Sequence, residues 1–241
     1  PTVNRFCRSL ETRGFPDFKL HLAQSLAHGT LYVNRNVDED DSVESYTGKI
    51  FESAMASLDQ VHHSLDMSAI NRAVDLLTQA KKIAFFGLGS SAAVAHDAMN
   101  KFFRFNVPVI YSDDIVLQRM SCMNCNDDDV VVIISHTGRT KSLVELAQLA
   151  RENDAMVIAI TSPGTPLSRE STLAITLDVP EDTDIYMPMV SRLAQLTVID
   201  VLATGFTLRR GAKFRDNLKR VKEALKESRF DKELSVHSND Q

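Results

Sequence analysis

The sequence predicts an α/β protein built on a parallel β-sheet with helices on both faces. From residue 82 onward, short apolar segments alternate with segments of helical period, and this alternation is typical of βαβ units, whose strands are parallel. The segment Val130–Ile134 is apolar at every position, as expected for a strand buried on both faces. In such sheets, ligands bind beyond the carboxyl ends of the strands, where the strand order reverses.

Five strands are expected between turn residues: Ile83–Phe86, Val109–Tyr111, Val130–Ile134, Met156–Thr161 and Leu173–Leu177. The helical pattern follows the first strand to about Phe105 and then recurs over four later segments: 115–122, 141–152, about 185–209 and 212–230. The segment 163–166 is rich in proline and glycine, so it is expected as a loop.

Four further helices are expected before the sheet, over 1–10, 17–27, 43–65 and 68–80. The polar, acid-rich segment 29–42 separates the second from the third and is typical of a linker. The neighbouring residues His62 and His63 are expected on the surface of the third helix rather than in a metal site.

Composition excludes several classes of protein. The chain has 241 residues, of which 44% are hydrophobic and 24% charged, which is typical of a globular protein. The net charge of −5 argues against non-specific nucleic-acid binding by the whole chain. No apolar segment has the length of a membrane span, and no signal-peptide pattern is present. We therefore expect a cytoplasmic protein without a membrane partner.

The cysteine content also favours a cytoplasmic protein. Cys7, Cys122 and Cys125 leave one thiol without a disulfide partner, which is typical of a reducing compartment. Cys122 and Cys125 form a CxxC pair, but no second pair supplies the further ligands that zinc needs. We expect a structural role for this pair, no metal site and no cofactor.

The most informative segment is Ser135–Ser142, which follows the strand Val130–Ile134 and opens a helix. Four of its side chains carry hydroxyl groups around a single glycine: Ser135, Thr137, Thr140 and Ser142. Backbone N–H groups at a helix N-terminus, its positive dipole end and nearby hydroxyls together suit a phosphate without any metal. The alternative is a merely capped helix start, since Thr140 is a good N-cap, but capping accounts for one hydroxyl only.

A second turn, Gly87–Ser91, follows the strand Ile83–Phe86 and is expected at the same edge of the sheet. It could open a dinucleotide-binding fold, with Asp113 or Asp114 near the ribose-binding position. A dinucleotide fold, however, has no use for the second, hydroxyl-rich turn.

Together these two turns resemble those of the sugar isomerase (SIS) domain, whose second loop follows a Ser-x-Ser/Thr-Gly-x-Thr pattern. The resemblance covers about residues 73–212 and implies a five-stranded parallel sheet that binds a phosphorylated sugar or sugar acid. Phosphate contacts are implied for Ser135, Thr137 and Thr140. Sugar contacts are implied for Ser90 and Ser91. The full candidate ligand-binding set is Gly89, Ser90, Ser91, Ser135, His136, Thr137, Gly138, Arg139 and Thr140; whether His136 contacts a ligand carboxylate or points away stays open.

The N-terminal segment resembles the end of an RpiR-type helix-turn-helix domain over residues 2–8 and 14–19. The resemblance makes Asn4, Arg5 and Arg8 candidate DNA contacts of a recognition helix; by themselves, two arginines would more often be a solvated helix face. Helices that precede the recognition helix in that family have no counterpart here. We therefore expect an N-terminally truncated chain that binds its ligand, with operator DNA bound only by the full-length protein.

The expected organisation has five parts: a helix-turn-helix remnant over 1–28, a linker over 29–42, a helical lead-in over 43–72, the SIS domain over 73–212, and a C-terminal helix and tail over 213–241. The resemblance implies a regulator of hexose-phosphate or Entner–Doudoroff metabolism that senses a phosphorylated sugar acid such as 2-keto-3-deoxy-6-phosphogluconate. Apolar stripes on the helices 43–65 and 185–209 favour a homodimer or a higher oligomer.

The alternative function is a sugar-phosphate isomerase. Such an enzyme needs a general base, for which the candidates are Glu181, Asp182, Asp184 and His96. A regulator needs only a ligand affinity that differs between two conformations. Because of the DNA-binding segment we expect a regulator, with no catalytic residues.

Overall fold

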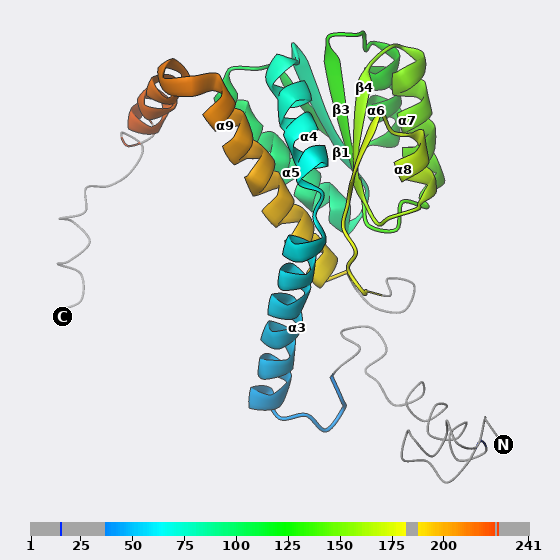
Figure 1. Ribbon diagram of the computed structural model, residues 1–241. Helices are drawn as coiled ribbons and strands as arrows, with labels where there is room; N and C mark the ends of the chain where they lie inside the picture. Colours follow the sequence, from blue (N-terminus) through cyan, green and yellow to red (C-terminus); the bar gives the residue numbers. More distant parts are fainter. Residues whose placement is uncertain (1–14, 16–36, 182–187, 225, 227–241) are drawn as a thin grey trace, which may run out of the picture. The chain divides into compact units, whose positions relative to one another are not determined.

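The computed structural model of the chain describes residue 15 and residues 37–181, 188–224 and 226 (Figure 1). The helices predicted at 1–10 and 17–27, with the candidate DNA contacts on the first of them, lie outside the described residues. The chain divides into two compact units, Pro1–Asp59 with Pro180–Val190 and Gln60–Val179 with Ser191–Gln241.

The second unit contains a five-stranded sheet whose paired strands are all parallel. Its strands are β1 (Lys82–Gly87), β2 (Val109–Ser112), β3 (Asp129–Ser135), β4 (Met156–Thr161) and β5 (Leu173–Thr176). The strand order is β2-β1-β3-β4-β5. The predicted α/β fold is therefore confirmed, and each predicted strand is found within one or two residues of its expected bounds.

Helices cover both faces of this sheet (Figure 1). On one face lie α4 (Met67–Gln79), α5 (Ser90–Phe102) with the 3-10 turn η1 (Phe103–Phe105), and α9 (Val190–Ala224); on the other lie α6 (Ile115–Met123), α7 (Lys141–Glu152) and α8 (Pro166–Glu170). Two of these elements, α8 and η1, were not expected. The sequence predicts a loop at the start of α8 and one continuous helix through η1.

Alternate residues of each strand pack on opposite faces. Phe86 of β1 joins a core cluster with Leu146 of α7, whereas the ring of Phe85 lies 5.1 Å from that of Phe102 in α5. All four side chains are fully buried. This explains why the strands are apolar at nearly every position.

The long helix α9 is interrupted at Gly211, which has φ 77° and ψ −166°. The predicted break between 209 and 212 is thus confirmed. The predicted start near Ile185 is wrong, since α9 begins at Val190. The physical reason is the cap at this end, since the carboxylate of Glu181 accepts from the N–H groups of Met189 and Val190 and so fixes the helix N-terminus there.

The helix α3 runs over Val43–Ser64. Its start lies in the first unit and is held by short-range polar contacts. The hydroxyl of Ser42 accepts from the N–H of Ser45 at 3.2 Å. Lys49 forms ion pairs with Asp38 at 3.0 Å and Asp41 at 2.7 Å. Hydrogen bonds from Lys49 and Ser45 lower the pKa of Asp41 to about 2. Across the described part of the chain, no helix is both long enough and apolar enough to cross a membrane.

Candidate functional site

The two turns singled out from the sequence follow neighbouring strands. Gly87 at the end of β1 pairs with Ile134 of β3, so the turn after β1 and the turn after β3 lie side by side at the carboxyl edge of the sheet. From β1 the chain passes through α5 to β2 on one side, whereas β3 lies on the other side. This is the point where the strand order reverses, which is where open α/β sheets bind ligands.

Two glycines shape the turn after β1. A Cβ on Gly87 would lie 2.6 Å from the carbonyl oxygen of Ser91, so the first turn of α5 packs directly on the end of the strand. Gly89 has φ 58° and ψ −128°, a conformation that glycine adopts far more readily than other residues. As a result Ser90, half-buried, and Ser91, buried, stand in the first turn of α5 at the edge of the sheet.

Gln118 of α6 ties this turn to the edge strand. Its side chain is fully buried, and its Nε2 donates to the carbonyl oxygen of Ser112 at 2.7 Å and to that of Gly87 at 3.4 Å. Ser112 ends β2 and Gly87 ends β1, so a single amide group links the carboxyl ends of both strands. Its Oε1 is buried without a hydrogen-bond partner among the described residues. Gln118 was not predicted as a site residue.

The turn after β3 is held by its own side chains. The buried hydroxyl of Ser135 accepts from the N–H of Gly138 at 3.2 Å, and that of Thr137 accepts from the N–H of Arg139 at 3.4 Å. Gly138 has φ 56°, in the left-handed region that favours glycine. The hydroxyls of Ser135 and Thr137 therefore each lie against a backbone N–H group of the same turn, while Arg139 is exposed.

A third turn, which follows β4, contacts the turn after β3. The N–H of Ser162 donates to the carbonyl oxygen of His136 at 2.9 Å, and the Nδ1 of His136 lies 3.5 Å from the Ser162 hydroxyl. The hydroxyls of Thr161 and Thr165 lie 3.2 Å apart, and both would overlap a Cβ on Gly138. Thr161, Ser162 and Thr165 were not predicted. Their only sequence signal is that they follow β4 at the same edge of the sheet.

The starts of α5 and α7 differ from those of the other described α-helices. The other helices begin with a side-chain oxygen that accepts from their first N–H groups; these oxygens belong to Ser42, Asp66, Asp114, Thr165 and Glu181. Neither Gly89 before α5 nor Thr140 before α7 makes such a bond within the described structure. The alternative that Thr140 merely caps a helix is therefore wrong. Both uncapped N-termini lie at the point where the strand order reverses, and such N-termini attract anions.

Two acidic residues that were candidates for the dinucleotide and isomerase alternatives cap helix N-termini. Asp114, a candidate ribose ligand of the dinucleotide alternative, accepts from the N–H groups of Val116 and Leu117 at 2.8 and 2.9 Å. Glu181, a candidate base of the isomerase alternative, accepts from Met189 and Val190 at 2.7 and 2.9 Å. Each carboxylate is thus committed to stabilising a helix.

Of the remaining candidate bases, the structure describes His96 alone. His96 is exposed on α5 with its ring 4.9 Å from that of Tyr111, two turns along the helix from Ser90. Asp182 and Asp184 lie outside the described residues.

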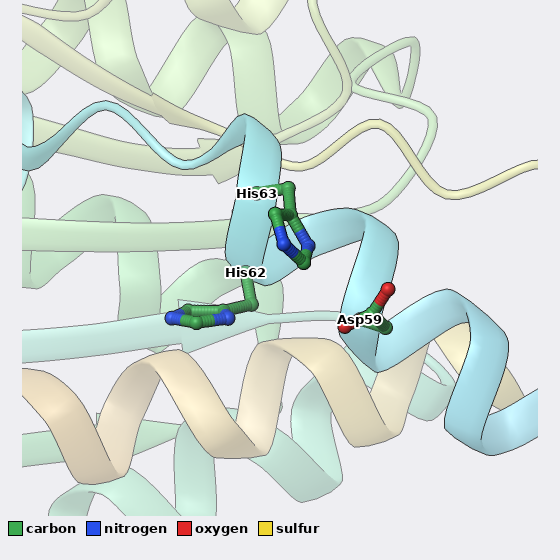
Figure 2. Close-up of side chains that lie close together, drawn as sticks. All are labelled: Asp59, His62 and His63. Atoms are coloured by element: carbon green, nitrogen blue, oxygen red, sulfur yellow. The ribbon is translucent and has the colours of Figure 1, made fainter.

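The other singled-out residues lie at surfaces or in packing positions. His62 and His63 are exposed at the end of α3, as expected, with Asp59 one turn earlier on the same helix (Figure 2). Cys122 is fully buried and Cys125 half-buried, both as free thiols. Burial raises the pKa of Cys122 to about 12 and also raises that of Cys125, which makes both poor nucleophiles.

The comparison with known families agrees with this architecture. The SIS domain matches residues 76–205, and the helix-turn-helix domain of the rpiR family matches residues 1–29. The chain belongs to the RpiR family of transcriptional regulators. Its SIS match contains both uncapped helix starts, and its helix-turn-helix match contains Asn4, Arg5 and Arg8.

Relatives in this RpiR family cover nearly all of the chain. The HTH-type transcriptional regulator HexR of Escherichia coli K12 is 90% identical over 240 residues, which are 100% of this chain and 83% of that protein. HexR of Pseudomonas aeruginosa is 56% identical over 230 residues, 95% of this chain and 81% of that protein. These similar proteins are regulators by name, not isomerases.

One solved structure extends the likeness to a complex. The Vibrio vulnificus NanR protein, solved in complex with ManNAc-6P, has a TM-score of 0.73 and 25% identity, and the match covers 95% of this chain and 82% of that one.

Proposed function

We propose that this RpiR-family regulator senses a phosphorylated sugar acid, such as 2-keto-3-deoxy-6-phosphogluconate, in the crevice between the turns that follow β1 and β3. Binding there adjusts its affinity for operator DNA, so that the protein acts as a repressor of genes for hexose-phosphate or Entner–Doudoroff metabolism. The observation that carries the proposal is the pair of uncapped helix N-termini, α5 and α7, on neighbouring strands.

In this proposal the phosphate lies at the start of α7, where it accepts from the hydroxyls of Ser135, Thr137 and Thr140. Ser90 and Ser91 at the start of α5 contact the sugar hydroxyls. Hydrogen bonds from these hydroxyls to a charged phosphate are shorter and stronger than hydrogen bonds between neutral groups. The NanR complex supports this class of ligand, because ManNAc-6P is also a phosphorylated sugar.

Near the same turn, His136 and Arg139 are the proposed contacts for the carboxylate of a sugar acid, while Gly89 and Gly138 let the backbone approach the ligand. Ser162 contacts both the backbone and the ring of His136, so the imidazole is positioned by the turn after β4 rather than by the ligand alone. No cofactor or metal enters this scheme.

The DNA-binding and assembly parts rest on the family and on sequence. Asn4, Arg5 and Arg8 are the proposed contacts to bases or phosphates, made in the full-length protein. We propose a homodimer or a higher oligomer, because a twofold assembly places paired recognition helices on palindromic half-sites. Such a regulator works where the operator DNA is, in the cytoplasm.

Calorimetry on the chain with a matched ligand pair tests the sensor. The pair is 2-keto-3-deoxy-6-phosphogluconate and the same sugar acid without its phosphate; glucose 6-phosphate and ManNAc-6P test the sugar part. We expect only phosphorylated compounds to bind. At a ligand concentration of about 100 times Kd, the free energy of unfolding should rise by about 2.7 kcal/mol. Equal affinity for the unphosphorylated compound would refute the phosphate site.

Two further measurements separate the alternatives. NMR of each mixture reports isomerisation, and turnover of any sugar phosphate would favour the isomerase over the regulator. Gel shifts with the full-length protein, with and without the bound compound, test the link to DNA. An Arg8→Ala variant should lose about 1–3 kcal/mol of operator affinity if Arg8 reads a base, and unchanged operator binding would overturn that assignment.

A further inference from the structure

Lys141 is the first residue of α7 and comes directly after the turn that follows β3. Among the α-helices that the structure describes, α7 alone begins with a charged residue. A positive charge is unfavourable there, because the N-terminus is the positive end of the helix dipole. The side chain is exposed, so packing gives no reason for a lysine either. The stability of the helix therefore does not account for this residue.

The partner that Lys141 would have on its own helix is paired elsewhere. Glu145 lies one turn along α7, at the spacing of an i,i+4 ion pair. Its carboxylate instead lies 3.3 Å from Nη1 of Arg119 in α6. Across the described residues, Lys141 makes no ion pair and no side-chain hydrogen bond. Its ammonium group is thus a positive charge that this part of the protein leaves unpaired.

Backbone donors lie at the same end of α7. The first of its N–H groups with an acceptor is that of Leu143, which donates to the carbonyl oxygen of Thr140 at 3.1 Å. The N–H groups of Lys141 and Ser142 have no acceptor within the described part of the chain. In a helix each Cα–Cβ bond leans toward the N-terminus, so the flexible stem of Lys141 starts in the direction of the turn after β3. The ammonium group can therefore reach the place where the phosphate is proposed to lie.

The charge of the proposed ligand gives a reason for a cation at this place. A phosphate monoester carries a charge of about −1.5 to −2 at pH 7, and a sugar acid adds a carboxylate. In the proposed function, His136 and Arg139 contact the carboxylate, whereas only neutral hydroxyl groups contact the phosphate. The chain as a whole has a net charge of −5, so its average field repels an anion. A cation beside the phosphate offsets this repulsion locally.

We propose that the ε-ammonium group of Lys141 is a further effector contact, which forms an ion pair with the phosphate at the start of α7. This inference deepens the proposed sensor and rests on it. Lysine suits the role, because it binds phosphate as a flexible point charge and needs no fixed two-pronged geometry. A bound phosphate also neutralises the charge that is unfavourable at the helix N-terminus. The ion pair therefore adds to the preference for phosphorylated compounds.

Calorimetry on two matched variants measures the contribution of this charge. Lys141→Gln removes the charge and keeps a similar helix propensity. The Kd of 2-keto-3-deoxy-6-phosphogluconate should rise roughly three- to tenfold, since the pair is exposed to water but involves a doubly charged group. The control is Lys222→Gln, because Lys222 is equally exposed in the last turn of α9 and should leave Kd unchanged. Equal Kd values for the two variants would overturn the assignment.

A third variant and added salt separate charge from shape. Lys141→Arg keeps the positive charge, so its Kd should stay closer to the wild-type value than that of Lys141→Gln. Raising the salt from about 0.1 to about 1 M shortens the Debye length from about 10 to about 3 Å. The difference in Kd between the wild type and Lys141→Gln should then narrow. An ion pair is contradicted if Lys141→Arg loses as much affinity as Lys141→Gln, or if the difference does not respond to salt.

Thermal unfolding without ligand shows whether the fold is damaged. Loss of a positive charge at a helix N-terminus should leave the Tm of Lys141→Gln unchanged or raise it by about 1–4 °C. A lowered Tm would mean that Lys141 stabilises the fold, against this inference.

The same measurements distinguish a wrong residue from a wrong sensor. If the wild type binds none of the phosphorylated compounds, the proposed function fails and the role of Lys141 fails with it. If the wild type binds and Ser135→Ala loses affinity while Lys141→Gln does not, the sensor stands and Lys141 alone is wrongly assigned.

Discussion

Gly138 lies so close to Thr165 that a Cβ on the glycine would overlap the threonine hydroxyl. Gly138 belongs to the turn after β3, and Thr165 caps α8 by accepting from the N–H of Ser168 at 3.2 Å. The N–H of Leu167 in α8 donates to the carbonyl oxygen of Gly138 at 3.1 Å. The short helix α8 therefore fixes the backbone of the proposed phosphate turn.

We expect Gly138→Ala to destabilise the protein and to abolish effector binding. The φ of 56° costs a side-chain-bearing residue about 1–2 kcal/mol, and the overlap with Thr165 adds about 1–3 kcal/mol of overpacking. The matched control is Gly164→Ala, where φ is 70° but nothing lies within 4 Å of the added Cβ. In thermal unfolding, each additional kcal/mol lowers Tm by about 2–4 °C for a chain of this size. Equal Tm values for the two variants would show that the close contact between residue 138 and Thr165 does not affect the free energy of unfolding.

Ser135→Ala and Ser91→Ala test the two turns one at a time. A hydrogen bond to a charged phosphate contributes about 1.5–3 kcal/mol, so Ser135→Ala should weaken effector binding roughly ten- to hundredfold. Ser91→Ala removes a contact to a neutral sugar hydroxyl and should cost less, about 0.5–1.5 kcal/mol. Ser171→Ala is the control, because its hydroxyl donates to the carbonyl oxygen of Ser168 at 3.0 Å at the far end of α8. Calorimetry gives the three affinities. The site assignment fails if both serine variants keep the affinity of the control.

Gln118→Met should weaken effector binding although Gln118 is no proposed ligand contact. The change keeps the side-chain volume but removes the Nε2 donor, which leaves the buried carbonyl oxygen of Gly87 and the half-buried one of Ser112 short of a partner, at about 1–3 kcal/mol. Gln118→Glu should be worse, because it replaces the donor by an acceptor. If the turn after β1 is positioned by this amide, effector Kd should rise in step with the loss of Tm; an unchanged Kd with a lowered Tm would mean that Gln118 stabilises the fold alone.

The sequence predicted the strands and the two turns well because both leave local signals. Buried parallel strands are apolar throughout, and the turns after β1 and β3 combine glycine with hydroxyl side chains. The helix α8 has five residues and a Thr-Pro start that equally suits a loop, so its pattern was too short to identify. Gln118 gave no signal at all, because a glutamine in a helix is ordinary until tertiary packing buries it against two strand ends.

Thr140 shows the reverse case. The sequence makes it a good N-cap, yet its side chain makes no capping bond to α7. N-cap propensity describes how often a residue type caps a helix when local interactions alone decide its conformation. At the edge where β1 and β3 end, the Thr140 hydroxyl makes no capping bond to α7. Positions where a residue departs from its usual local role, here the N-cap role of threonine, are often functional sites.

The thiol of Cys122 should be almost unreactive in the folded protein. Burial raises its pKa to about 12, so at pH 7.5 the thiolate is on the order of one molecule in 30,000, and only the thiolate reacts with iodoacetamide. Cys125, half-buried with a raised pKa as well, should react more slowly than a free cysteine but faster than Cys122. Mass spectrometry of tryptic peptides after timed alkylation measures both, with urea-unfolded protein as the control in which the two rates converge. Rapid labelling of Cys122 at neutral pH would contradict its place in the core beside α7 and would reopen the CxxC pair as a reactive site.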